Sequence, residues 1–260
     1  MTTVPASLER FYSELAPLLF GRIDVAELER RLGSSPSGPV NLDFYRVLLG
    51  RNVDRILREL FPSVHALVER ERPGTWPGLV RAYADSVGDE GMRGAGTTVR
   101  DPNRFGLEFA DFLASRRAAD PGQPEVLEEL ADWHMCRYLA AVAPEPAVGE
   151  PEPDGFEVRV FVRGYTHPIP RFARALAQTP ASPIPDPRAT TVVIYRSLLG
   201  ERSLRAHRPT AAELAALAHR EGITPTGPLA EIGPAALAEG LARLVARGIV
   251  GERGAGLGRG

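Results

Sequence analysis

The feature that most constrains this chain is a run of alternating side chains between residues 156 and 163. Apolar side chains occupy every second position, and charged ones fall between them: Phe156, Val158, Val160 and Val162 against Glu157, Arg159 and Arg163. A period of two is typical of a β-strand with one buried and one solvated face. Gly164 and the prolines at 168 and 170 predict the end of this strand. A chain that contains such a strand needs a sheet, so an all-helical fold is excluded.

The residues before this run have a different period. Apolar residues recur at every third or fourth position, which predicts about six helices and no strand before residue 144. The predicted helices cover 8–19, 25–32, 42–60 with a continuation at 64–70, 76–87, 102–114 and 125–142. Phe61-Pro62 interrupts the third helix because proline cannot continue a helix. The glycine-rich segment 88–101 is predicted to be a loop.

The residues after the run combine strands with helices. A β-branched and aromatic stretch predicts a strand at 190–196, and a third strand is expected at 203–207. Helices are predicted at 169–178, at 210–221, where Thr210 and Glu213 form a capping box, and at 234–247. Residues 248–250 are a candidate closing strand. This order is similar to a winged-helix unit, which also occurs in many protein-binding modules.

Residues 144–154 are acidic and rich in proline, with almost nothing apolar to bury. Such a stretch behaves as a semi-rigid extended spacer, so a domain boundary is predicted there. We therefore expect an α+β protein with a helical bundle at 1–143, a linker at 144–154 and a smaller α/β domain at 155–250. The smaller domain is expected to have a short antiparallel sheet and winged-helix-like helices, and the Gly-rich tail at 251–260 is expected to be disordered.

The composition excludes several classes of protein. A formal net charge of -2 argues against bulk nucleic-acid binding, which relies on a basic field. The single cysteine, Cys136, rules out an internal disulfide and suits a reducing compartment. The N-terminus lacks the basic start of a signal peptide, and no stretch approaches the ~20 apolar residues that cross a bilayer. A soluble, cytoplasmic protein is expected.

The sequence carries no catalytic or metal-binding motif. It contains no Gly-x-Ser-x-Gly elbow, phosphate loop, HExxH or dinucleotide fingerprint. His134 and Cys136 are the only closely spaced soft metal ligands, and positions i and i+2 of a helix point roughly 200° apart. We therefore expect no catalytic residues, no metal site and no enzymatic activity of this chain by itself.

The arginines of the alternating run have two interpretations. Arg159 and Arg163 either form a solvated face that keeps a sheet edge soluble, or contact acidic side chains of an extended peptide that adds to the sheet. The residues by themselves leave both interpretations open.

Several motifs, in their order and spacing, resemble a bacterial family. They are Tyr45-Arg46, Phe61-Pro62 with Val64, Leu67 and Val68, Phe109-x-x-Phe112-Leu113, Leu127 to Trp133, Tyr165-Thr-His-Pro168-Ile-Pro170-Arg171 and Val193-Ile-Tyr195-Arg196, followed by the C-terminal helical pair. The chain looks like a member of the HvfC/BufC-type peptide-modification chaperones (MbnC-like), whose N-terminal module was long labelled a DNA-binding domain. The likeness covers most of residues 40–250. It departs at Val47-Leu48, where family members often have paired asparagines.

The resemblance implies a non-catalytic partner of a multinuclear non-haem iron oxidative enzyme of barrel fold. The iron would belong to that enzyme, so no cofactor is expected in this chain. The helical half would dock on the enzyme through Tyr45, Arg46, Phe61 and Pro62. The sheet half would hold the leader segment of a ribosomally synthesised precursor peptide, by strand addition at 156–163 or at 191–196. The residues expected to bind the peptide are Arg159, Phe161, Arg163, Val193, Tyr195 and Arg196.

A winged-helix transcription regulator is the alternative function. It needs a recognition helix with Arg, Asn or Gln on its exposed face. The predicted helices at 210–221 and 234–247 offer few such side chains, and their charges are mixed in sign. Nucleic acid is therefore not the expected partner.

Overall fold

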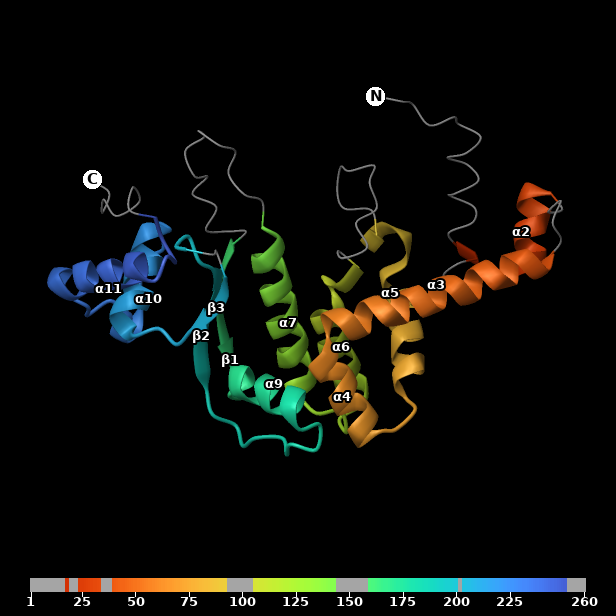
Figure 1. Ribbon diagram of the computed structural model, residues 1–260, viewed down its shortest axis with the longest axis horizontal. Helices are drawn as coiled ribbons and strands as arrows, with labels where there is room; N and C mark the ends of the chain where they lie inside the picture. The colour runs from red at the N-terminus through yellow and green to blue at the C-terminus, as the bar shows by residue number, and fades with distance from the viewer. Residues whose placement is uncertain are drawn as a thin grey trace, which may run out of the picture. The chain divides into compact units, whose positions relative to one another are not determined.

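The computed structural model describes residues 17–18, 23–33, 39–92, 105–143, 159–200 and 203–251, and for 39–46, 49 and 88–92 it describes the backbone only. These residues form nine α-helices and a three-stranded antiparallel sheet, which confirms the predicted α+β class (Figure 1). The chain divides into two compact units. The helical unit comprises residues 1–132 and 173–182, and the sheet unit comprises residues 133–172 and 183–260.

Some predictions fall on other parts of the chain. The linker at 144–154, most of the helix at 8–19 and the tail beyond Gly251 lie outside the described residues. The predicted domain boundary therefore stays a prediction. Across the described ranges, no helix combines the length and apolar character that a membrane span requires.

The helical unit follows the predicted order of helices. They are α2 (Val25–Leu32), α3 (Pro39–Leu60), α4 (Pro62–Glu71), α5 (Trp76–Met92), α6 (Phe109–Ala119) and the first part of α7 (Val126–Val142). Pro62 stands in the first turn of α4, where its missing N–H removes no helical hydrogen bond. The loop predicted at 88–101 is wrong for residues 88–92, which continue α5. A glycine inside a helix costs only about 1 kcal/mol, and α5 tolerates two in this segment. The helix predicted at 102–114 begins later, at Phe109.

Aromatic rings form the centre of the helical unit's core. Phe61, Trp76, Tyr83, Phe105 and Phe109 are each no more than 1% exposed. Ring centroids lie 4.7 Å apart for Phe61 and Phe109 and 4.9 Å apart for Tyr83 and Phe109, in the tilted geometries that aromatic quadrupoles favour. The Tyr83 hydroxyl donates to the Phe105 carbonyl, so its polar atom is satisfied. Each buried ring contributes roughly 1.5–3 kcal/mol to folding.

The sheet unit is built on β1 (Val160–Tyr165), β2 (Thr190–Arg196) and β3 (Leu204–His207). β2 lies between the other two strands and is antiparallel to both. The register pairs Val160 with Tyr195 and His207 with Val193. The strands predicted at 190–196 and 203–207 are confirmed, and so is the helix at 169–178, which is α9 (Ile169–Gln178). The residues of α9 from Ala173 onward belong to the helical unit.

One face of the sheet packs against α10 (Ala211–Arg220) and α11 (Pro234–Ala246), drawn in blue in Figure 1. The buried side chains of this core are Val160, Val193, Tyr195, Ala216, Leu217, Leu241, Leu244, Ile249 and Val250. The predicted capping box opens α10: the Thr210 side chain accepts from the Glu213 N–H, and the Glu213 carboxylate accepts from the Thr210 N–H at 2.7 Å. A short 3-10 turn at Gly227–Leu229 lies between the two helices.

β1 differs from its prediction in two respects, and residues 156–158 lie outside the described part. The strand continues through Gly164 to Tyr165, so Gly164 does not end it. Val162, predicted to be buried with Val160, is 36% exposed. The core that α10 and α11 form on this face includes Val160 but not Val162, so part of the Val162 side chain stays in solvent although it shares the face of Val160.

Residues 248–250 form no strand, contrary to the prediction. Gly248 has a φ of 68°, and the N–H groups of Gly248 and Ile249 donate to the carbonyls of Val245 and Leu244. This is a Schellman ending of α11, and N–H groups that turn back to a helix cannot join a ladder. Ile249 and Val250 still bury their side chains, at 0% and 2% exposure, which explains why their apolar pattern indicated a strand.

Candidate functional site

The two apolar residues predicted to bind peptide on β2 lie in the core of the sheet unit. Val193 is 0% exposed and Tyr195 is 3% exposed. β2 is also the central strand, so both of its edges are already paired. Strand addition at 191–196 is therefore excluded, and of the two predicted strands only β1 has an edge that no described residue pairs.

Arg159 is positioned by main-chain carbonyls. Its guanidinium donates to the carbonyl of Arg196 at 2.8 Å and to that of Ile249 at 2.7 Å, with a longer contact of 3.4 Å to Gly248. These bonds connect the start of β1 to the end of β2 and to the segment after α11. The geometry gives Arg159 an internal structural role in the sheet unit.

Phe161, Arg163 and Arg196 share one face of the sheet, as the register requires. The Arg163 guanidinium carbon lies 5.6 Å from the centroid of the Phe161 ring, and its NH1 donates to the Val162 carbonyl at 3.2 Å. Arg196 donates to the Ala141 carbonyl near the end of α7 at 3.3 Å. The structure therefore brings Phe161 and Arg163 together on β1 and directs Arg196 toward α7.

The outer side of β1, which we call the β1 edge, is the candidate site. In the described part of the chain β1 pairs with β2 only. Its six residues span about 20 Å of extended chain. Val162 is exposed on one face, and the Phe161–Arg163 pair lies on the other. β3 is also an edge strand, but with four residues it offers a shorter ladder.

The residues predicted to dock on a partner enzyme differ in how far they are exposed to solvent. Phe61 is 0% exposed and belongs to the aromatic core, whereas Pro62 is exposed. Tyr45 and Arg46 fall within α3, and their side chains lie outside the described part. The next two residues, Val47 and Leu48, are 48% and 42% exposed. The sequence marked this pair only as a departure from the family pattern, because a helical period does not show which apolar residues stay exposed.

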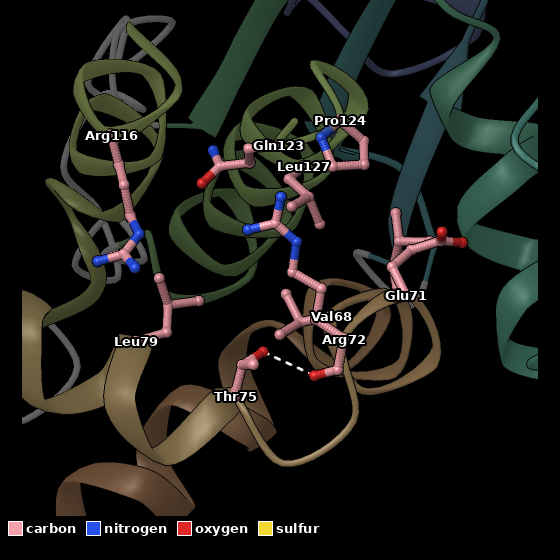
Figure 2. Close-up of a pocket in the computed structure, with 10 residues that line it drawn as sticks. Val68, Glu71, Arg72, Thr75, Leu79, Arg116, Gln123, Pro124 and Leu127 are labelled. Carbon is pink, nitrogen blue, oxygen red and sulfur yellow. Dashed lines mark hydrogen bonds between the residues drawn. The ribbon is translucent and has the colours of Figure 1, made fainter. Parts of the chain in front are cut away.

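A cavity of about 100 Å³ lies in the helical unit between α4, the start of α5, α6 and the segment before α7 (Figure 2). Leucines 67, 79 and 127 line it, and the Arg72–Asp120 ion pair lies at its margin. The Thr75 hydroxyl donates to the Arg72 carbonyl at 2.7 Å, the bond drawn dashed in Figure 2. Ligand sites usually measure about 300–1,000 Å³. This cavity is too small to be a substrate site.

His134 on α7 has an unusual environment. Burial lowers its pKa to about 4, and the charge of Arg137 adds to the shift. Its buried Nε2 has no hydrogen-bond partner among the described residues. Within the same residues, no group of three or more His, Cys, Asp or Glu is placed to hold a metal ion. At neutral pH the His134 imidazole is uncharged.

Comparison with known proteins adds no family assignment. No protein-family model matches this chain, and no curated protein matches it.

Proposed function

We propose that this protein is a non-catalytic partner that recruits an extended peptide to a modifying enzyme. The observation that carries the proposal is the β1 edge, whose six residues have a strand on one side only among the described residues. An exposed edge strand is a template for pairing with another chain unless it is blunted or covered. Main-chain hydrogen bonds supply the affinity, and side chains at alternate positions supply the selectivity.

The resemblance described above supports the identity of the ligand and the enzyme. On that basis the peptide is the leader segment of a ribosomally synthesised precursor, and the enzyme is a multinuclear non-haem iron oxidative enzyme that carries the metal. The complex would act in the cytoplasm. Phe161 and Arg163 would contact one face of the added strand and Val162 the other.

The arginines of the C-terminal helices favour this proposal over DNA binding. A recognition helix needs free cationic or amide side chains to reach base edges. On α11, Arg243 pairs with Glu239, and the Arg247 Nε lies 3.7 Å from the buried carboxylate of Glu213. On α10, Arg220 lies beside Glu221 at 3.6 Å. The other exposed positions of α11 include four alanines: Ala235, Ala238, Ala242 and Ala246.

Co-purification tests the proposed role directly. The tagged protein is co-expressed with an iron-dependent enzyme encoded beside it and with that enzyme's precursor peptide. We expect a stable complex that contains iron in the enzyme and retains the precursor. A protein that elutes alone in the presence of both would contradict the proposal.

Strand addition has a sharper test in synthetic precursor peptides that are N-methylated at alternate residues. Consecutive residues of a strand point their N–H groups to opposite sides, so only one of the two methylation patterns blocks the ladder. We expect one methylated peptide to lose binding and the other to bind like the unmodified peptide. Equal binding of both would exclude a main-chain ladder.

A further inference from the structure

A groove of about 320 Å³ lies at the end of the sheet where β1 finishes. The first turn of α9, the start of β2 and the end of β3 form its walls. Three arginines from these three segments line it: Arg171, Arg188 and Arg208. Thr190, Thr191 and His207 also line it. Among the described residues no aspartate or glutamate lines the groove, although the carboxylate of Glu213 contacts His207.

These three arginines differ from the rest of the sheet unit. The side chains of Arg171, Arg188 and Arg208 are exposed and make no hydrogen bond or ion pair with the described residues. The other described arginines of this unit contact a carboxylate, a carbonyl, a hydroxyl or an aromatic ring: Arg137, Arg159, Arg163, Arg196, Arg205, Arg220, Arg243 and Arg247. Among the described residues of the unit, the unpaired guanidinium groups are therefore gathered in one groove.

The charge of the groove defines the chemistry of its ligand. A guanidinium is always protonated and presents a planar set of donors that matches a carboxylate bidentately. Three such groups around one groove repel one another unless negative charge lies between them. A ligand with at least two negative charges suits this groove.

We infer that the groove binds two closely spaced carboxylates of an acidic peptide segment. The inference rests on the peptide-recruiting function proposed above and adds the chemical class of the peptide. Tyr165 pairs with Thr190 and Gly164 with Thr191, so the groove begins where the sheet ends. A peptide paired with β1 that continues beyond Tyr165 reaches the same end of the sheet. The Thr191 hydroxyl is a further polar group of the groove. The Thr190 hydroxyl already donates to the Arg188 carbonyl at 2.9 Å, and His207 Nε2 lies 3.0 Å from the buried Glu213 carboxylate.

The experiment measures the binding of synthetic peptides to the full chain. Two fluorescein-labelled Gly/Ser peptides are compared by anisotropy, one containing Glu-Gly-Glu and the other Gln-Gly-Gln. The groove variant is Arg171→Gln/Arg188→Gln/Arg208→Gln. The matched control is Arg51→Gln/Arg81→Gln/Arg174→Gln, which removes the same charge from three other exposed arginines that have no described partner. Unfolding midpoints of both variants confirm that each is folded, and the single variant Arg188→Gln serves if the triple variant does not fold.

We expect the protein to bind the Glu peptide more tightly than the Gln peptide. The groove variant should weaken this binding about tenfold or more, because each charged hydrogen bond contributes roughly one power of ten. The control variant should bind like the unaltered protein. Equal weakening by both variants, equal binding of both peptides, or displacement of the Glu peptide by equimolar inorganic phosphate would overturn the inference. Duplex DNA that binds through the same three arginines would also overturn it.

This measurement uses neither the iron enzyme nor the natural precursor. If the protein does not prefer the Glu peptide, the co-purification result still stands. If the iron enzyme does not co-purify, the measured peptide affinities still stand. The two proposals fail separately.

Discussion

At Gly240 the two C-terminal helices meet backbone to backbone. A Cβ at this position would lie 2.5 Å from the carbonyl oxygen of Ala212 and 3.0 Å from the amide nitrogen of Glu213 in α10. Backbone atoms within a helix cannot move aside as a flexible side chain can. Only glycine therefore permits this approach of α10 and α11.

The variant Gly240→Ala should lower the free energy of unfolding by about 1–3 kcal/mol, the usual cost of overpacking. Gly50 on α3 is the matched control, since nothing lies within 4 Å of a Cβ there. Gly50→Ala should raise the stability by up to about 1 kcal/mol through helix propensity. Urea unfolding of both variants checks the prediction, and shifts of the same sign would contradict it.

His134 should make the stability depend on pH. Its folded pKa of about 4 lies below the ordinary value of 6.5, because burial disfavours the charged imidazolium. The unfolded chain therefore binds a proton first as the pH falls. Stability should be lost from about pH 6.5 downward and level off below the folded pKa, with a total loss of roughly 3 kcal/mol.

The variant His134→Phe should remove the part of the pH dependence of stability that His134 causes. Its unfolding free energy should change less than that of the unaltered protein between neutral pH and about pH 4. Urea unfolding over a pH series measures the two slopes. Identical slopes would show that His134 does not carry the effect.

At the scale of elements, Arg159 joins parts of the chain that are far apart in sequence. Its bonds to the carbonyls of Arg196 and Ile249 hold the segment after α11 against the end of the sheet. Residues 248–250 form no strand, so pairing between strands does not hold this segment against the sheet. The segment is instead fixed by one half-buried cation, the buried side chains of Ile249 and Val250, and a bond from the Leu198 N–H to the Gly248 carbonyl.

The variant Arg159→Met should therefore destabilise the fold by about 1–3 kcal/mol, the value of hydrogen bonds to a charged group. Hydrogen exchange at the amides of 248–250 should become faster. Arg205→Met is the control, because the exposed Arg205 of β3 has one side-chain bond within the described residues, to the Ser203 hydroxyl just before that strand. An Arg159→Met protein of unchanged stability that binds peptide more weakly would instead support the predicted peptide contact.

At the scale of the whole molecule, the two compact units have different proposed roles. The sheet unit carries the β1 edge and the arginine groove, and the helical unit carries the predicted enzyme contacts. Phe61 is not suited to test docking, because Phe61→Ala would cost about 3–5 kcal/mol of core packing. The exposed pair Val47 and Leu48 is suited, since it follows Tyr45 and Arg46 directly.

The double variant Val47→Ser/Leu48→Ser should reduce co-purification with the iron enzyme and leave peptide binding unchanged. The reason is that apolar side chains at the centre of an interface supply much of its affinity. Ile223→Ser is the control, since Ile223 is 61% exposed in the sheet unit. Unchanged recovery of the enzyme with the double variant would exclude this pair as a docking contact.

Local signals in the sequence predicted the elements well. The β-branched run at 190–196, the Thr210–Glu213 capping box and the break at Pro62 all act over a few residues, and each was confirmed. The same locality explains the errors. Ile249 and Val250 show an apolar pattern that a strand and a buried helix ending share, and glycines near residue 90 do not reveal whether a helix continues through them.

The alternating run from 156 to 163 determined by sequence alone that the protein contains a sheet. The tertiary structure decided what that sheet offers. It placed β2 at the centre of the described sheet, with β1 at its edge, and packed α10 and α11 on Val193 and Tyr195. It turned Arg159 toward carbonyls and gathered Arg171, Arg188 and Arg208 around one groove. Strand order and the meeting of distant side chains depend on contacts between residues far apart in the chain, and a periodic pattern contains no information about such contacts.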